Sequence, residues 1–179
     1  LLLSCATPAV AEETGDKIVE PTLSKDAAAY DAEHPELLEE DQLIAYSAIL
    51  IAEDSGEVIF EKDADTLRYP ASTTKIMTVL LGLMMVDDLN QTVTVSQRAV
   101  DVPADSSTMG LEAGEEINFT DLLYGTMLVS ANDGANVIAE TVSGSIENFV
   151  DLMNQTAEIF GCTSTHFANA HGYHDDNHY

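Results

Sequence analysis

Residues 76–85 form the most strongly apolar stretch of the chain, and they constrain the fold more than any other feature does. The stretch reads IMTVLLGLMM, with large apolar side chains around nearly the whole circumference of a helix. Pro70 ends the extended chain before it, and the hydroxyls of Ser72 and Thr73 can cap a helix over 72–86. Helices that are apolar on all sides are found in the middle of a domain. We therefore expect the rest of the fold to pack around this helix.

Short β-rich runs and further helices surround the apolar helix in the sequence. Residues 45–52 and 58–60 flank an Asp-Ser-Gly turn, which predicts an antiparallel hairpin, and 92–95 is a further short strand candidate. Thr120 and Asp121 have the character of a helix N-cap. Helices are expected over about 120–129, 135–142 and 145–160, and the chain from residue 161 onward is expected to be irregular. The pattern predicts an α+β domain with a hairpin followed mostly by helices.

The N-terminal quarter of the chain differs from the rest in composition. Residues 1–11, LLLSCATPAVA, resemble the end of a secretory signal peptide, because an apolar run precedes a small-x-small cleavage pattern. Cys5 as a lipoprotein cysteine and an arbitrary apolar terminus remain as alternatives. Residues 12–41 contain eleven acidic residues and two lysines with almost no apolar periodicity, so we expect a disordered, acidic leader. Residues 42–179 are expected to form the folded domain.

Charge and cysteine content exclude several classes of function. The formal net charge of −26 repels phosphate backbones, so nucleic-acid binding is not expected. The two cysteines lie far apart in unlike contexts and do not form a disulfide framework. No internal apolar run approaches the ~20 residues of a membrane span. The sequence favours an exported globular enzyme or binding protein.

Ser72 and Lys75 are the first candidates for chemistry. Residues three apart share a helix face, so the hydroxyl and the amine can touch. The positive end of the helix would lower the cost of an alkoxide on Ser72. Apolar neighbours would favour the neutral form of Lys75 and allow it to act as a base. A capping serine and a lysine that extends its amine to solvent explain the same four residues, so the motif is weak alone.

Ser130-Ala131-Asn132 is the second candidate motif, in a break between two expected helices. A hydroxyl and an amide one residue apart can project the same way from an extended turn. The hydroxyl of Ser130 could pass a proton to a leaving group, and the amide of Asn132 could bind both Lys75 and a substrate carbonyl. An ordinary polar turn between helices is the alternative.

Taken together, the motifs resemble those of the serine D-alanyl-D-alanine carboxypeptidases, the low-molecular-mass penicillin-binding proteins. The likeness covers most of residues 45–179 and is carried by PASTTKIMT at 70–78, SANDGAN at 130–136 and THFANAHGYHDDNHY at 165–179. S-x-x-K, S-D-N and K-T-G form a motif set in related enzymes, and S-A-N is a variant of the second. The resemblance implies the penicillin-binding-protein and serine β-lactamase type of transpeptidase fold, an antiparallel sheet flanked by helices.

The resemblance also implies a role for each motif residue. Ser72 would attack the carbonyl between the two terminal D-alanines of a peptidoglycan stem peptide, and Lys75 would take its proton. Ser130 would relay a proton to the departing D-alanine, and Asn132 would orient Lys75 and the substrate. Penicillins and other β-lactams would acylate Ser72 because they mimic the dipeptide. No cofactor and no metal are implied, and the protein would act at the extracytoplasmic face of the bacterial membrane or in the cell wall.

One family motif has no counterpart in these 179 residues. The third motif, Lys-Thr-Gly on an edge strand, is missing, and Lys75 is the last lysine in the sequence. In the family that strand supplies a cation for the substrate carboxylate and one oxyanion-hole N–H. We expect that the sequence is truncated at both ends and that a further segment, which could also bind the membrane surface, follows Tyr179. A degenerate, noncatalytic relative is the alternative.

The histidines and Cys162 allow other hypotheses. His166, His171, His174 and His178, with Asp175 and Asp176, could be drawn as a metal site, but only His174 and His178 have helical i, i+4 spacing. The resemblance instead implies a metal-free loop near the active site. Cys162 is expected to be a buried, inert thiol rather than a nucleophile.

Three rival functions remain open on sequence grounds. A class A β-lactamase shares the fold and the first motif, but the E-x-x-L-N loop that such enzymes use for deacylation is not found after Asn132. A DD-endopeptidase would use the same residues as the carboxypeptidase. A peptidoglycan- or penicillin-binding module without turnover is the non-enzymatic alternative.

Overall fold

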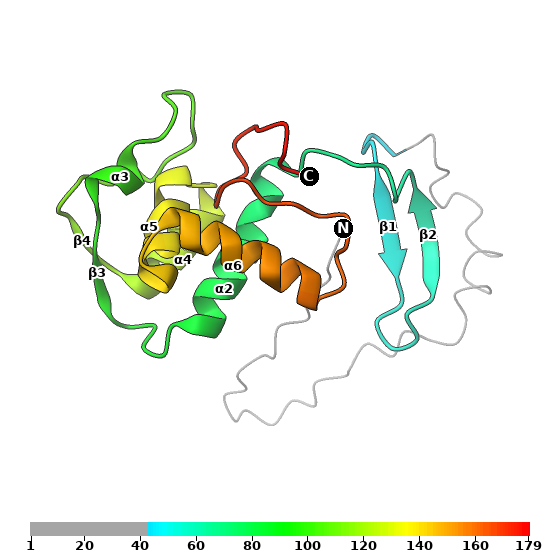
Figure 1. Cartoon of the computed structure of the whole chain (residues 1–179), viewed down its shortest axis with the longest axis horizontal. Helices are drawn as coiled ribbons and strands as arrows, with labels where there is room; N and C mark the ends of the chain where they lie inside the picture. Colours follow the sequence, from blue (N-terminus) through cyan, green and yellow to red (C-terminus); the bar gives the residue numbers. More distant parts are fainter. Residues whose placement is uncertain (1–42) are drawn as a thin grey trace, which may run out of the picture. The chain divides into compact units, whose positions relative to one another are not determined.

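The computed structural model of the protein describes residues 43–179. The expectations for the signal-peptide remnant at 1–11 and the acidic leader at 12–41 lie outside the described residues. The chain divides into two compact units, the first ending at Thr66 and the second running from Leu67 to Tyr179 (Figure 1).

The described part of the first unit is a β-hairpin. Strand β1 (Ala48–Ile51) pairs antiparallel with β2 (Val58–Lys62), and the register shifts between Leu50 and Ile51. Gly56 lies in the tight turn with a φ of 71°, a conformation that favours glycine. The predicted hairpin is confirmed.

The second unit begins with the apolar helix. A short 3-10 turn, η2 (Ala71–Thr73), leads directly into α2 (Thr74–Met85). Helix α2 contacts α4 (Phe119–Leu128), α5 (Asn132–Ser143) and α6 (Ile146–Ile159), so three helices pack against it. The expected burial on all sides is wrong, because these three helices cover only part of its circumference. About half of the surface of four of its apolar side chains is exposed: Ile76, Leu83, Met84 and Met85.

Helix α5 lies at the centre of the second unit, between α2, α4 and α6 (Figure 1). Its first two turns are fully buried, and it ends at Gly144, which takes the left-handed conformation of a helix C-terminus. The helix begins at Asn132, one turn earlier than predicted. The N-cap of α4 is Asn118 rather than Thr120, since the Asn118 side chain accepts hydrogen bonds from the backbone N–H groups of Thr120 and Asp121.

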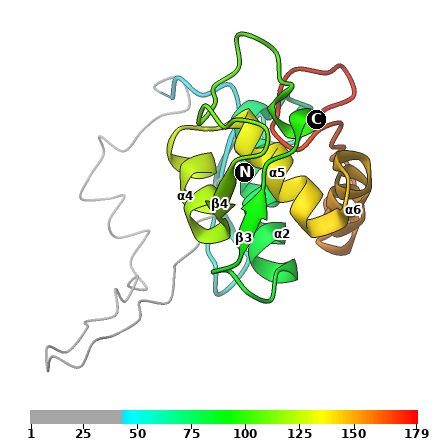
Figure 2. The same cartoon turned by 90° about the vertical axis from the view of Figure 1, so that its left-hand side faces the viewer.

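A small antiparallel ribbon completes the second unit. Strand β3 (Thr92–Thr94), which the sequence predicted, pairs with β4 (Glu116–Asn118) (Figure 2). Neither β4 nor the short helix α3 (Gln97–Val100) was predicted, because three or four residues are too few to show a periodic pattern. The loop that joins α3 to β4 forms one wall of the cleft described below.

Two clusters of buried side chains hold the second unit together. One joins α2, α5, α6 and the C-terminal segment, through Leu81, Ala135, Ala139, Phe149, Met153, Ala157, Phe167 and Ala170. The other joins α4 and α5 to the region of β3 and α3, through Val93, Val95, Ala99, Phe119, Leu122, Leu123, Val137 and Ile138. Residues 161–179 form no helix or strand, as predicted. Among the described residues, no helix combines the length and the apolar character that a membrane crossing requires.

Candidate active site

A cleft of about 280 Å³ opens at the N-terminal ends of α2 and α5. Ser72 of η2 and Asn132 of α5 both line it. Its remaining walls come from three segments, with lining residues Tyr69, Pro70, Ala71, Asp105, Ser106, Ser107, Gly172, Tyr173, His174, Asp175 and His178. Segments far apart in the sequence therefore meet around the hydroxyl of Ser72.

Ser72 lies in the 3-10 turn immediately before α2. Its Oγ is 3.2 Å from Nζ of Lys75, so the i, i+3 spacing brings the two side chains into contact as the sequence predicted. The expected capping role is wrong, because neither Ser72 nor Thr73 caps the helix with its side chain. The Thr73 hydroxyl donates to the carbonyl of Pro70 instead. The Ser72 hydroxyl is thus left to Lys75 and the cleft.

Lys75 is a buried amine with three oxygen neighbours. Its side chain is 2% exposed. Besides Ser72 Oγ, Nζ contacts Oδ1 of Asn132 at 2.8 Å and the backbone carbonyl of His171 at 2.7 Å. Burial without a neighbouring carboxylate lowers the pKa of Lys75 from 10.5 to about 8, because desolvation penalises the charged form. About a tenth of the molecules therefore carry a neutral amine at pH 7, and about half do at pH 8.

The contacts of Lys75 also fix the direction of its lone pair. The Asn132 and His171 oxygens can only accept hydrogen bonds, so they take the two N–H groups of a neutral amine. The lone pair that remains faces the Ser72 hydroxyl. This arrangement suits the transfer of a proton from Ser72 to Lys75.

Asn132 is held on both sides of its amide group. Its Oδ1 accepts from Lys75, and its Nδ2 donates to Oγ of Ser106 at 3.0 Å. The backbone N–H of Asn132 donates to the carbonyl of Ser107 at 2.8 Å. These contacts fix the orientation of the amide and bind the loop over 105–107 to the start of α5.

Ser130 is the one predicted site residue that stands apart from the other three. It lies between α4 and α5 with a φ of 59°, so the turn is left-handed at this position rather than extended as expected. It is not among the residues that line the cleft, and none of the hydrogen bonds that Ser72, Lys75 and Asn132 make within residues 43–179 goes to it. The structure therefore brings Ser72, Lys75 and Asn132 together and leaves Ser130 at the edge of the site.

Asp133 fixes the wall of the cleft that precedes β4. Its buried carboxylate accepts hydrogen bonds from the backbone N–H groups of Met109, Gly110 and Leu111, at 3.0 to 3.1 Å, and from Gly134 at 2.8 Å. Asp133 stands in the SANDGAN motif, but no role was predicted for it. A signal existed, since Asp133 is the one charged residue in the first two turns of α5 and a buried carboxylate needs hydrogen-bond donors.

The C-terminal segment packs directly on the turn that carries Ser72. Gly172 has a φ of +84°, and a Cβ added to it would lie 1.8 Å from the carbonyl oxygen of Ala71. The Thr78 hydroxyl donates to the carbonyl of Ala170 at 2.5 Å, which ties the segment to α2 one turn further along. Only a glycine at position 172 permits the close approach of this segment to Ala71.

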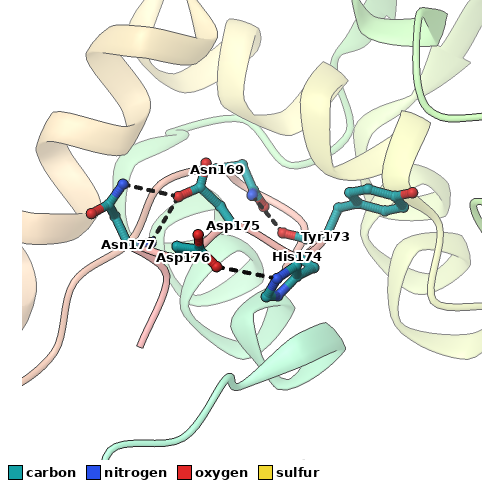
Figure 3. A network of polar contacts seen from close by, with 6 residues as sticks. All are labelled: Asn169, Tyr173, His174, Asp175, Asp176 and Asn177. Carbon is teal, nitrogen blue, oxygen red and sulfur yellow. Dashed lines mark hydrogen bonds and ion pairs between the residues drawn. The ribbon is translucent and has the colours of Figure 1, made fainter.

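Side chains of the same segment stabilise its turns (Figure 3). The Asn169 Nδ2 donates to the carbonyl of Tyr173, and Asp175 accepts from both the backbone and the side chain of Asn177. The Tyr173 hydroxyl donates to Asp105 at 3.0 Å and so joins the two loops that flank the cleft. This hydrogen bond raises the pKa of Tyr173, because the carboxylate disfavours a phenolate beside it.

The histidines and the cysteine of this region have other partners than a metal. His174 lies 3.5 Å from Asp176 and stacks edge-on against Tyr69. Within residues 43–179, no group of three or more His, Cys, Asp or Glu side chains is placed to hold a metal ion. Cys162 is a free thiol that is only partly buried, packed against the core that α5 and α6 share.

Comparison with protein families and curated proteins gives a consistent result. Residues 33–179 match the family described as Peptidase S11, D-alanyl-D-alanine carboxypeptidase. The chain is 37% identical over 139 residues to the D-alanyl-D-alanine carboxypeptidase DacF of Bacillus subtilis, covering 75% of this chain and 35% of the relative. It is 35% identical over 144 residues to DacA of Haemophilus influenzae, covering 77% and 36%. The chain thus spans about a third of the length of these relatives.

Solved structures show the same relationship. Penicillin-binding protein 5 from Haemophilus influenzae superimposes with a TM-score of 0.71 at 34% sequence identity, covering 77% of this chain and 42% of that one. The S216A mutant of Streptomyces K15 DD-transpeptidase gives a TM-score of 0.71 at 29% identity, covering 76% and 56%. The expected transpeptidase type of fold is confirmed.

Proposed function

The chain belongs to the peptidase S11 family of D-alanyl-D-alanine carboxypeptidases, and we propose that the protein is a serine-type D-Ala-D-Ala carboxypeptidase. Its substrate would be a peptidoglycan stem peptide that ends in D-Ala-D-Ala, from which it would release the terminal D-alanine. The observation that carries the proposal is the contact between Ser72 and Lys75, a hydroxyl 3.2 Å from a buried amine.

Acylation follows from this contact. Neutral Lys75 takes the hydroxyl proton of Ser72 as Oγ attacks the carbonyl carbon between the two D-alanines. The C–N bond then breaks, the leaving amine of D-alanine receives a proton, and the peptide remains as an ester on Ser72. A water molecule hydrolyses the ester and restores the hydroxyl. Each step uses only the side chains, the substrate and water.

The other two motif residues support the transfer. Asn132 fixes Lys75 from one side and, with Nδ2 bound to Ser106, keeps its carbonyl oxygen aimed at the amine. We assign to Ser130 the relay of a proton toward the leaving D-alanine. That role requires Ser130 to approach the cleft when substrate is bound.

The family relationship also supports binding of β-lactams and an extracytoplasmic site of action. A penicillin would acylate Ser72 because its strained amide replaces the D-Ala-D-Ala bond. The solved relatives include a penicillin-binding protein. Stem peptides lie outside the cytoplasmic membrane, so the protein would be exported.

The missing third motif limits what the 179 residues can do by themselves. They contain no Lys-Thr-Gly, and no lysine follows Lys75. A cation for the substrate carboxylate and one oxyanion-hole donor would be lacking, and the loss of one such donor costs about 10²–10³ in rate. We therefore propose impaired activity for these residues in isolation.

The function is tested with the full-length protein expressed from its complete gene. It is reacted with a fluorescent penicillin and, separately, incubated with a pentapeptide ending in D-Ala-D-Ala. A stable label that is lost in the Ser72→Ala variant, together with release of D-alanine, is the expected result.

Other results would point to the rival functions. Rapid loss of the label would identify a β-lactamase. Cleavage of cross-linked dimers without D-alanine release would identify an endopeptidase. Reversible binding of penicillin or peptidoglycan without a covalent label would identify a binding module and would overturn the proposal.

A further inference from the structure

His178 lines the cleft and joins two segments that are about a hundred residues apart in sequence. It is 2% exposed. One ring nitrogen, Nε2, is 2.7 Å from Oγ1 of Thr74, and the other, Nδ1, accepts a hydrogen bond from the backbone N–H of Ala168 at 3.1 Å. The ring of Phe167 packs edge-on against it at 5.7 Å between centroids.

These contacts determine the tautomer of the ring. A backbone N–H can only donate, so Nδ1 must offer its lone pair to Ala168. In a neutral imidazole the proton then resides on Nε2, and Nε2–H donates to the Thr74 hydroxyl. A doubly protonated ring would place two N–H groups face to face at Ala168. These two hydrogen bonds are therefore compatible with only one of the three protonation states of His178, the neutral ring with its proton on Nε2.

Thr74 couples this ring to the reacting groups. It lies between Ser72 and Lys75, at the first position of α2. The same segment that His178 holds supplies the His171 carbonyl to Lys75 and packs Gly172 against Ala71. Moving Thr74 relative to this segment would change the distance between the Lys75 amine and its carbonyl acceptor.

We propose that His178 is a positioning residue: its neutral ring, protonated on Nε2, binds the Thr74 hydroxyl and holds the turn that carries Ser72 and Lys75 against residues 168–172. The proposal rests on the proposed function, since it concerns the reactivity of Ser72. Within the described residues, no hydrogen bond joins His178 to Ser72 or Lys75, and its ring acts by connecting Thr74 to Ala168.

The charged groups around the ring favour its neutral state. Desolvation is the main cause that lowers the pKa of His178, and His166 lowers it further, while Asp175 opposes them. On the other side of the segment, burial lowers the pKa of His171 to about 4, with Lys75 and His178 contributing. Because the pKa is lowered, His178 is neutral at pH 7 and becomes charged only in acid.

The test compares variants of the full-length protein for the second-order rate of acylation by fluorescent penicillin. Thr74→Val keeps the shape of residue 74 and removes the hydroxyl, whereas Thr74→Ser keeps the hydroxyl. His178→Asn can still accept from Ala168 but is too short to reach Thr74. Thr163→Val, on an exposed side chain outside the cleft, is the matched control for Thr74→Val.

Loss of one positioning hydrogen bond is expected to lower the rate about tenfold in Thr74→Val and His178→Asn. Thr74→Ser and Thr163→Val are expected to stay within about twofold of the unsubstituted protein. Thermal midpoints are measured in parallel, so that a variant that fails to fold is recognised. Rates of Thr74→Val and His178→Asn within twofold of the unsubstituted protein would overturn the proposal.

A pH series separates positioning from a structural role. The pKa of His178 is lowered from the ordinary 6.5 of histidine, so the ring should be protonated only at a pH below that value. Protonation of Nδ1 should break the hydrogen bond from Ala168 in the unsubstituted protein. The ratio of its rate to that of His178→Asn should therefore shrink from about tenfold at pH 8 toward one as the ring becomes protonated. A ratio that stays constant after NMR shows a proton on Nδ1 in acid would contradict the proposal.

The protonation state itself is read by nitrogen NMR of protein labelled with ¹⁵N-histidine. The His178 ring is expected to show a proton on Nε2 and none on Nδ1 at pH 7. A proton on Nδ1 would overturn the inference whatever the rates are. An unsubstituted protein that does not acylate at all would refute the proposed function, and with it the positioning role, whereas normal acylation in every variant would refute the positioning role alone.

Discussion

The chemistry of the site is concentrated on a single amine. Lys75 has an amide oxygen, a backbone carbonyl and a hydroxyl around Nζ. It has no carboxylate partner among these contacts, so desolvation is not offset by an ion pair and the pKa falls to about 8. Burial thus converts an ordinary cation into a group that can take a proton near neutral pH.

Replacing Lys75 with methionine tests this role. Methionine keeps the length and the apolar stem but has no proton acceptor of useful basicity. We expect the rate of acylation by penicillin to fall by about 10²–10⁴, the usual contribution of a general base. Label formation under pseudo-first-order conditions measures it, with Lys62→Met in the first unit as the control. Unchanged acylation in Lys75→Met would rule out Lys75 as the base.

The pH dependence of acylation follows from the lowered pKa of Lys75. Below about pH 8 most amines are charged and have no lone pair for the Ser72 proton. The rate should therefore fall about tenfold for each pH unit below that value, and it should level off above it. Stopped-time labelling between pH 6 and 10 gives the profile. A rate that stays flat down to pH 6, or that levels off only near pH 10.5, would contradict a buried neutral base.

At the scale of single residues, contacts between side chains at a fixed spacing along a helix could be predicted from the sequence. Contacts made by backbone carbonyl groups could not. Ser72 and Lys75 meet because residues three apart share a helical face. The carbonyl of His171 comes from an irregular segment, and carbonyl groups carry no sequence signal, so this partner was not predictable. The left-handed backbone of Ser130 was also not predicted, because a non-glycine residue with positive φ is uncommon.

At the scale of elements, loops rather than helices complete the cleft. The loop over 105–111 is attached to α5 through Asn132 and Asp133, and the loop over 168–178 is attached to α2 through Thr74, Lys75 and Thr78. Helices α2 and α5 pack against each other, so both loops take their position from one rigid pair. The cleft therefore depends on a few polar anchors.

Asp133→Asn tests the anchor of the first loop. An amide has one acceptor oxygen where a carboxylate has two. Some of the four backbone N–H groups that bind Asp133 would therefore face an NH₂ group instead of an acceptor. Unsatisfied buried donors cost about 1–3 kcal/mol each, and we expect the free energy of unfolding to drop by that order. Urea denaturation measures it, with the exposed Asp151→Asn as the control. Equal midpoints for the two variants would show that Asp133 does not anchor the loop.

Elements with a strong periodic pattern were predictable, and short ones were not. The hairpin, β3 and the four long helices follow from alternation and from apolar stripes. The start of α4 was misplaced because Asn118, Thr120 and Asp121 could each cap a helix, and the hydrogen bonds of the structure select Asn118. The start of α5 was misplaced because its N-cap residue, Ala131, has no capping side chain. Strand β4 gains its stability from pairing with β3, which a three-residue stretch does not reveal.

At the scale of the whole chain, the described residues leave an apolar surface uncovered. A groove between α2 and α4 is lined by Val79, Leu83, Leu89, Thr120, Leu123, Tyr124 and Met127. Contiguous apolar surface of this kind promotes association unless it is covered. The sequence predicted a helix that is buried all round, and the amount of apolar surface it needs to bury exceeds what α4, α5 and α6 cover.

The last prediction concerns the 179 residues taken alone and compared with the full-length protein. They place Ser72, Lys75 and Asn132 in contact but lack the Lys-Thr-Gly motif that would hold a substrate carboxylate and polarise its carbonyl. We expect fluorescent penicillin to label them at least about 10² times more slowly than the full-length protein, as for the loss of an oxyanion-hole donor. We also expect self-association through the uncovered apolar surface and the open edges of the strands.

Labelling rates and size-exclusion chromatography with light scattering measure the two effects on the same samples. Ser72→Ala in both lengths of chain corrects for nonspecific label. Slow labelling by a monomeric, folded sample would assign the deficit to the missing motif, whereas slow labelling by an aggregate would assign it to the uncovered surface. If the 179 residues acylate as fast as the full-length protein, then the contact between Ser72 and the Lys75 amine is sufficient for acylation, and the third motif is not needed for that step.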